Sequence, residues 1–325
     1  MAPRRSGCPP IGGGTRVVLS CIGGHCIQYG ADHGRYAVQI RSRAVSDTPD
    51  ARKQGARDTV AGSVLLAAPA PTICHAYTRL SAVAHPRKGT LTRAVIRRGY
   101  WEPLETEIFC GLLRPGALVI DVGANFGHYA LIAANAIGPE GLVVAFEPHL
   151  ETFALLDANR KLLPQDNLLA VQAGLGASDG SMEIYTDTAN PGGHSFFDWN
   201  LRATDGSSRR APIRALDSFL SERIPHRAVD VIKIDVQGFE MEALRGAVGT
   251  IERYRPAVLC EVTPEALRRA GSGVEDLLGF FRTRVYGAEV LLTGDGPVRK
   301  MDTPELIEFF GRFEAEYHDV LFRPA

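Results

Sequence analysis

Residues 118–127 read Leu-Val-Ile-Asp-Val-Gly-Ala-Asn-Phe-Gly, and this stretch decides the fold. Leu118–Val122 is apolar except for Asp121, a pattern that is typical of a buried strand. Gly123 allows a tight turn directly after that strand, and Gly127 opens a helix predicted over residues 128–137. The stretch therefore predicts a strand, a loop and a helix whose first N–H groups are free to meet a nucleotide-like ligand.

The same alternation of apolar strands and helices continues along the chain. Strands are predicted near residues 142–146, 168–172, 182–185, 229–234, 256–260, 289–292 and 318–322. Helices are predicted near residues 104–113, 150–162, 216–223, 239–248 and 274–281, and residues 187–212 read as a polar loop. This order predicts an α/β fold with a mostly parallel sheet that helices cover on both faces.

Acidic residues end four of the predicted strands. Asp121, Glu147, Asp235 and Glu261 each close a different apolar run. Because ligands of parallel sheets bind beyond the carboxyl ends of the strands, we expect these side chains to cluster along one edge and to mark the site.

The charge of the first loop separates three kinds of cofactor site. A P-loop needs a Gly-Lys-Ser/Thr sequence, which is absent. A dinucleotide site prefers Gly-x-Gly-x-x-Gly with a helix N-terminus aimed at pyrophosphate, which Asp121 would repel. S-adenosylmethionine has a sulfonium, an ammonium and a carboxylate but no phosphate. The loop, with Gly123, Asn125 and Gly127, is therefore predicted to bind S-adenosylmethionine.

Two further acidic residues belong to the predicted cofactor site. Glu147 follows Asp121 by 26 residues, where a carboxylate can accept hydrogen bonds from both ribose hydroxyls. The alternative is that Asp121 and Glu147 only cap helices. Asp179 is a candidate ligand of the adenine amine, or else a turn aspartate before Gly180.

These motifs together resemble the FkbM-type methyltransferases. The resemblance rests on Asp121-Val122-Gly123-Ala124-Asn125-x-Gly127, Phe146-Glu147-Pro148 and Lys233-Ile234-Asp235-Val236-Gln237-Gly238-Phe239-Glu240, together with Gly99-Tyr100-Trp101-Glu102-Pro103 and Glu261. It implies a Rossmann-like class I methyltransferase fold, whose seven-stranded sheet has an antiparallel last strand. It also implies S-adenosylmethionine as donor and a hydroxyl of a sugar, glycolipid or natural product as acceptor. The family often has Glu where this chain has Gln237.

Three residues are candidates for the base that removes the acceptor proton. Asp235 and Glu240 flank the loop after the strand at residues 229–234, and burial or a like-charged neighbour would have to raise the pKa of either carboxyl. Alternatively, both hold a divalent cation with Glu261, or they only stabilise the turn and the helix. His194 in the polar loop is a rival base, because its ordinary pKa suits proton removal. Lys233 is expected to reach a carboxylate.

The N-terminal part of the chain has a different charge balance. Residues 1–100 hold 15 Lys and Arg against four Asp and Glu, whereas residues 101–325 hold 21 against 33. Residues 1–78 are therefore predicted to be a basic, disordered extension with a strand near residues 35–40, and residues 79–325 to be the methyltransferase domain. No nucleic-acid partner is expected.

Cysteine usage and hydropathy bear on the compartment. Cys110 and Cys260 lie in apolar runs and read as reduced core thiols, and the six cysteines show no metal-site spacing. No apolar run reaches the roughly 18–20 residues that a membrane span needs. The sequence therefore predicts a cytoplasmic protein without a transmembrane segment.

Two other functions are compatible with such a fold. A non-catalytic nucleotide-binding or scaffolding module would keep the fold but would not need every acidic strand end. A dehydrogenase would need the dinucleotide loop, which this chain lacks. The intact set of carboxylates favours the methyltransferase.

Overall fold

The computed structural model describes residues 101–187, 193–198, 206–292, 298–313 and 316–325 in full, and the backbone of five earlier strands. These strands are β1 (Leu19–Ile22), β2 (His25–Asp32), β3 (Arg35–Ser42), β4 (Gly62–Leu66) and β5 (Leu80–Ala84). β1, β2 and β3 form an antiparallel sheet, so the strand expected near residues 35–40 is present.

The chain divides into two units, Met1–Ser63 and Val64–Ala325. The predicted domain boundary after residue 78 stays a prediction, as does disorder in the extension. The side chains of Cys8, Cys21, Cys26 and Cys74 lie outside the described residues, whereas Cys110 and Cys260 are free thiols.

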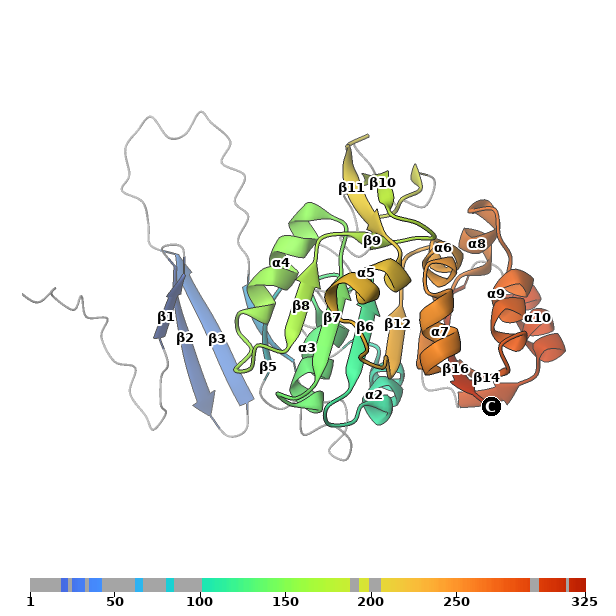
Figure 1. Ribbon diagram of the computed structural model, residues 1–325. Helices are drawn as coiled ribbons and strands as arrows, with labels where there is room; N and C mark the ends of the chain where they lie inside the picture. The colour runs from blue at the N-terminus through green and yellow to red at the C-terminus, as the bar shows by residue number, and fades with distance from the viewer. Residues whose placement is uncertain are drawn as a thin grey trace, which may run out of the picture. The chain divides into compact units, whose positions relative to one another are not determined.

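An eight-stranded sheet forms the centre of the second unit. Its order is β15-β14-β16-β13-β12-β6-β7-β8, and Figure 1 shows β8, β7, β6 and β12 side by side. The strands are β6 (Leu118–Val122), β7 (Leu142–Phe146), β8 (Leu168–Val171), β12 (Val231–Ile234), β13 (Ala257–Val262), β14 (Tyr286–Leu291), β15 (Val298–Met301) and β16 (His318–Pro324). β16 runs antiparallel to β13 and to β14. The expected mostly parallel sheet with an antiparallel last strand is therefore confirmed, and β15 is an eighth strand at its edge.

Helices cover both faces of the sheet. On one face, α2 (Pro103–Leu112), α3 (His128–Ile137) and α4 (Leu150–Arg160) pack around Phe109, Leu131 and Leu156. The other face carries α5 (Leu216–Arg223), α6 (Glu240–Arg245), α7 (Val248–Tyr254), α8 (Pro264–Arg269), α9 (Val274–Arg282) and α10 (Thr303–Arg312). We call these the α2–α3 face and the α5–α10 face.

The structure corrects several predicted elements. The helix expected over residues 239–248 is two helices, α6 and α7, which separate where Gly246 packs against Gly176: a Cβ on Gly246 would lie 2.0 Å from the Gly176 carbonyl oxygen. The polar loop expected over residues 187–212 contains part of β11 (Ser208–Arg214). β11 pairs with β10 (Gly180–Tyr185) and with β9 (Gly174–Leu175). Helices α8 and α10 were not predicted.

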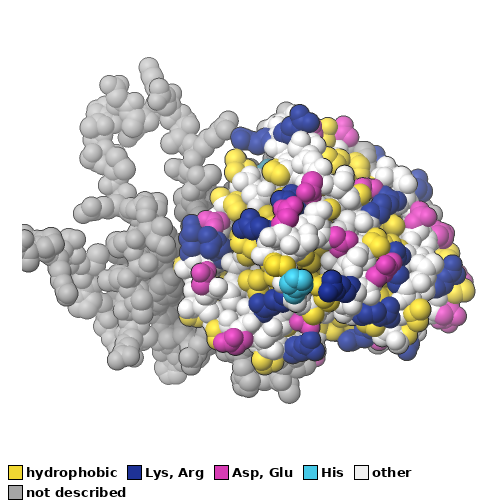
Figure 2. Space-filling model, in the orientation of Figure 1, with side chains coloured by type: hydrophobic (Ala, Val, Ile, Leu, Met, Phe, Trp, Pro, Cys, Tyr) yellow, Lys and Arg dark blue, Asp and Glu magenta, His cyan; other side chains and the backbone are white. Residues whose placement is uncertain are grey.

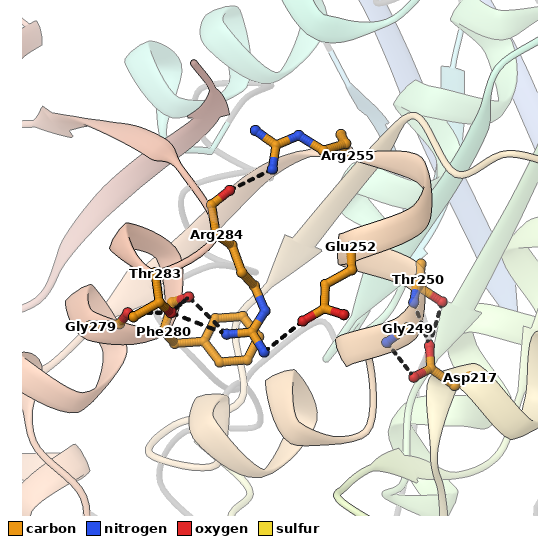
Figure 3. A network of polar contacts seen from close by, with 9 residues as sticks. All are labelled: Asp217, Gly249, Thr250, Glu252, Arg255, Gly279, Phe280, Thr283 and Arg284. Atoms are coloured by element: carbon orange, nitrogen blue, oxygen red, sulfur yellow. Dashed lines mark hydrogen bonds and ion pairs between the residues drawn. The ribbon is translucent and has the colours of Figure 1, made fainter.

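A network of polar contacts holds the helices of the α5–α10 face together (Figure 3). Asp217 in α5 accepts hydrogen bonds from the backbone N–H groups of Gly249 (2.7 Å) and Thr250 (2.8 Å) and from the Thr250 hydroxyl (2.6 Å). Arg284 after α9 forms an ion pair with Glu252 of α7 (3.0 Å). Because α7 is tied on both sides, the packing that supports β12 and β13 is fixed.

Figure 2 shows one face of the molecule with its side chains coloured by type. On the face seen in Figure 2, basic and acidic side chains are interspersed. Within the described part of the chain, none of the helices has both the length and the apolar character needed to cross a bilayer.

Candidate active site

A cleft lies at the carboxyl ends of β6, β7 and β12, as the acidic strand ends predicted. Its described lining consists of Gly123, Asn125, Glu147, Pro148, Ile184, His194, Ser195, Phe196, Asp235, Val236 and Gln237. Three of the predicted cofactor ligands are therefore part of the lining, namely Gly123, Asn125 and Glu147. Asp121, Gly127 and Asp179 are not.

The glycines of the first loop are required by the packing of the chain itself. Gly123 has φ +82°, and a Cβ there would lie 1.9 Å from the carbonyl oxygen of Asp235. Gly127 has φ +102°, and its Cβ would lie 2.8 Å from Leu156 Cδ1 of α4. The loop after β6 is thus pressed against the loop after β12, and this contact closes one side of the cleft.

Glu147 occupies the end of β7 with its carboxylate turned toward the first loop. Its two oxygens accept hydrogen bonds from the backbone N–H groups of Asn125 (2.9 Å) and His149 (2.8 Å). The residue is 6% exposed, and burial raises its pKa to about 7 although both hydrogen bonds oppose the shift. Each oxygen keeps a further lone pair for a ligand hydroxyl. The bond to His149, which precedes α4, also fits the capping alternative.

Asp121 lies beneath the cleft on the α2–α3 face. It is 2% exposed, and its Oδ2 has no hydrogen-bond partner among the described residues. Burial raises its pKa to about 7, with Lys233 opposing the shift and Asp235 adding to it. Its role toward the cofactor stays a prediction.

Asp179 is engaged away from the cleft. Its Oδ1 accepts a hydrogen bond from the backbone N–H of Ala215 (2.7 Å) and lies 3.2 Å from Arg214 Nε. These contacts fit the turn alternative, and none of them supports a contact with adenine.

Asp235 is one of the two candidate bases that line the cleft, the other being His194. Its N–H continues the strand ladder by donating to the Val122 carbonyl (3.0 Å). The Gln237 side-chain amide donates to Asp235 Oδ1 and to Glu261 Oε1, each at 2.9 Å. Gln237, at the position where the family often has Glu, therefore links two carboxylates through an uncharged amide.

The alternative of a divalent cation finds no support in the described part of the chain. No three His, Cys, Asp or Glu side chains there form a group that could hold a metal ion. Glu261 also lies within β13 rather than after it, because the strand continues to Val262.

Glu240 supports the backbone rather than the cleft. Its Oε1 accepts a hydrogen bond from the Gly238 N–H (2.9 Å), and its Oε2 has no partner among the described residues. The residue is buried and does not line the cleft. This geometry fits the turn-stabilising alternative for Glu240 and gives no support to its predicted role as a base.

Replacing Glu240 by glutamine should stabilise the protein at alkaline pH but not at acidic pH. Burial raises the Glu240 pKa from 4.5 to about 7, so its contribution to stability is full below pH 4.5 and is lost as the pH rises through 7. Glutamine keeps the acceptor for Gly238 and cannot ionise. We expect equal stability at low pH and a gain of about 3 kcal/mol at high pH, measured by urea unfolding at both. An equal loss at both pH values would contradict this.

His194 lines the cleft but is not set up to act as a base. Its Nδ1 accepts a hydrogen bond from the Asp187 N–H (3.0 Å), and its ring stacks on His149 with centroids 3.6 Å apart. Burial and the neighbouring His149 lower its pKa to about 3. A neutral ring that accepts at Nδ1 has its proton on Nε2 and is therefore a donor there.

Three residues were not predicted from the sequence as site residues, namely Glu102, Tyr129 and Asp319. The Tyr129 hydroxyl of α3 donates to Glu102 Oε2 (2.9 Å), and Lys233 Nζ donates to Asp319 Oδ1 (3.3 Å). The expectation that Lys233 reaches a carboxylate is confirmed. Asp319 opens an antiparallel strand, and such a strand brings its first residues to the edge where parallel strands end. The direction of this strand could therefore have indicated Asp319 from the sequence. No sequence pattern indicates the contact of Glu102 with Tyr129.

The arrangement defines a class of protein. The strand order β8-β7-β6-β12-β13-β16-β14 with β16 antiparallel, a glycine loop after β6 and a carboxylate after β7 are those of a Rossmann-like class I methyltransferase. Residues 121–289 match the Methyltransferase FkbM domain. This match spans more than half of the chain, which therefore belongs to the FkbM methyltransferase family.

Individual proteins that are similar to this chain are also methyltransferases by name. The chain is 27% identical over 145 residues to Methyltransferase 1 of Beauveria bassiana, covering 40% of this chain and 58% of that protein. It is 29% identical over 133 residues to the hexuronic acid methyltransferase AglP of Haloferax volcanii, covering 41% and 50%. The chain thus spans about half the length of these relatives. A solved methyltransferase FkbM from Methylobacillus flagellatus is 15% identical with a TM-score of 0.38, over 71% of this chain and 53% of that one.

Proposed function

We propose that this chain is an S-adenosylmethionine-dependent methyltransferase that acts on a hydroxyl of a sugar, glycolipid or natural-product acceptor. The observation that carries the proposal is the charge of the cleft. Glu147 and Asp235 line it, and no Lys or Arg is among its described lining residues. A pyrophosphate would meet two carboxylates there, whereas a ligand with two positive charges and two ribose hydroxyls finds acceptors.

The residues of the cleft and the buried Asp121 divide the work of binding. Glu147 accepts hydrogen bonds from the ribose hydroxyls, and the unpaired Oδ2 of Asp121 provides negative charge for the ammonium of the methionine half. Ile184, Phe196 and Val236 offer apolar surface that excludes water. When bound, S-adenosylmethionine supplies an electrophilic methyl group.

Asp235 is the residue that we propose for the acceptor hydroxyl. It lines the cleft beside Gly123, and its carboxylate is held by one hydrogen bond from Gln237. It accepts the proton that the hydroxyl loses as the oxygen is methylated. A sugar acceptor is supported by the relative whose name gives hexuronic acid as its substrate.

Replacing Glu147 by alanine should lower the affinity for S-adenosylhomocysteine about 100-fold. Two hydrogen bonds to a charged group are lost, each contributing about 1.5 kcal/mol. Isothermal titration measures this, with thermal melts to confirm that the variant is folded. The affinity of Glu147→Gln should lie between those of the wild type and Glu147→Ala. Glu151→Ala changes an exposed residue in the first turn of α4 and should bind like the wild type.

The same titration tests the proposed function as a whole. The wild-type protein should bind S-adenosylmethionine and S-adenosylhomocysteine and should not bind NADH. Absence of a heat of binding for both sulfur compounds would exclude the methyltransferase and favour a module that keeps only the fold.

A further inference from the structure

Charged side chains at the carboxyl end of the sheet gather on one of its two faces. Asp121 pairs in register with Lys233, and Glu261 lies directly opposite Asp319. Each lies two positions along its strand from a core residue of the α2–α3 face, namely Val119, Val231, Leu259 and Leu321, and therefore shares that face. The alternate positions on the α5–α10 face are apolar, namely Val122, Ile234, Cys260, Val262 and Val320. We call Glu102, Asp121, Tyr129, Lys233, Asp235, Glu261 and Asp319 the polar layer.

The polar layer has a large excess of acid over base. It contains five carboxyl groups and one lysine. Lys233 bonds to Asp319 Oδ1 (3.3 Å) and lies 5.1 Å from the centre of the Tyr129 ring. Asp319 is 0% exposed, yet its Oδ2 has no hydrogen-bond partner among the described residues. A buried carboxylate oxygen without a donor is costly, and it indicates a place for a donor from outside the chain.

The electrostatics of the layer agree with a missing positive charge. Burial, and then Asp319, raise the pKa of Glu102 to about 8, with Lys233 opposing the shift. Burial, and then Asp235 and Asp319, raise the pKa of Glu261 well above its usual range. One lysine does not offset the mutual repulsion of these carboxylates.

The layer is also within reach of a ligand. Asp235 and Gln237 line the cleft, and Gln237 bonds directly to Glu261. On the other side, Glu102 is partly exposed, and Tyr317 is 41% exposed. Burial raises the pKa of the Tyr317 phenol, and Glu102 and Glu261 raise it further. The layer thus lies between the cofactor cleft and solvent.

The backbone of Glu102 adopts an uncommon conformation. It precedes α2 with φ 42° and does not cap that helix with its side chain. Such a left-handed conformation is uncommon and costly for a residue other than glycine. The carboxylate is instead held by Tyr129 of α3, facing the charges of the sheet.

We propose that the polar layer is the acceptor subsite, and that it takes an acceptor with an ammonium group near the methylated hydroxyl, as in an amino sugar or amino alcohol. The inference rests on the proposed function and concerns the acceptor only. Asp121 serves the cofactor and Asp235 the hydroxyl, while Glu102, Glu261 and Asp319 surround the ammonium.

Ethanolamine is the smallest probe that carries both groups. We expect 50 mM ethanolamine hydrochloride to raise the melting temperature of the protein saturated with S-adenosylhomocysteine by about 3 °C. Ethylene glycol at the same concentration, with sodium chloride to match the ionic strength, should have no such effect. Equal shifts for the two compounds would overturn the proposal.

Two variants locate the effect. Glu102→Gln keeps an acceptor for Tyr129 but removes the charge, so it should abolish the ethanolamine shift. Glu107→Gln, within α2, should retain the shift. A full shift in Glu102→Gln would overturn the proposal. The affinity for S-adenosylhomocysteine should be equal in the wild type and both variants. If the wild type did not bind S-adenosylhomocysteine, that result would count against the proposed function rather than against the subsite.

Discussion

Replacing Asp235 by asparagine is expected to lower the turnover number about 10²- to 10⁴-fold while leaving the affinity for S-adenosylhomocysteine nearly unchanged. Asparagine keeps the shape of the side chain and the oxygen that accepts from Gln237, but it cannot take up a proton. The rate is measured as transfer of tritium-labelled methyl groups to an acceptor found by screening amino sugars, amino alcohols and neutral sugars.

A matched variant separates chemistry from folding. Asp230 precedes β12 at the opposite edge of the sheet, where its Oδ2 accepts from the Leu118 N–H (2.8 Å) and its Oδ1 pairs with Arg114. Asp230→Asn should therefore lower the free energy of unfolding and leave the turnover number unchanged. If Asp235→Asn kept more than about a third of the wild-type turnover number, Asp235 would be excluded as the general base.

Replacing Gly123 by alanine should cost about 4 kcal/mol or more of folding free energy. The φ of +82° would strain any residue with a side chain, and the new Cβ would lie 1.9 Å from the Asp235 carbonyl oxygen. Because that oxygen belongs to the backbone, the loops after β6 and β12 must move apart, and both line the cleft. Urea unfolding measures the loss, and cofactor binding should disappear with it.

Gly116→Ala is the control for the backbone term. Gly116 has a similar φ of +77°, but an added Cβ would meet nothing within 4 Å. Its cost should be about 1–2 kcal/mol, the price of the left-handed backbone alone. If both alanine variants lost the same free energy of unfolding, the close contact between the loops after β6 and β12 would add nothing to the cost, and the explanation given for Gly123 would be wrong.

The central strands and the first helix were predictable because their burial is uniform. β6, β7 and α3 have the expected limits, since nearly all of their residues are buried. β11 and β15 were missed because most of their side chains are exposed and carry no apolar pattern. α10 did have a signal, the capping box in which Asp302 and Glu305 bond to each other's N–H.

The site was predictable only as far as the backbone determines it. Gly123, Glu147 and Asp235 lie where strand ends must meet, so their place followed from the order of the strands. The directions of Glu240 and His194 depend on single hydrogen bonds to Gly238 and Asp187, which no local pattern reveals. For the same reason the excess of acid on the α2–α3 face emerges only when four strands and two helices are assembled.

The position of β16 bears on how the molecule assembles. This strand follows β14 and β15 along the chain but lies between β13 and β14 in the sheet. Until it inserts, both neighbours present open edges, which are prone to pair with other molecules. Its pairing with β13 also places Asp319 opposite Glu261, two like charges, and Lys233 offsets part of their repulsion through its bond to Asp319.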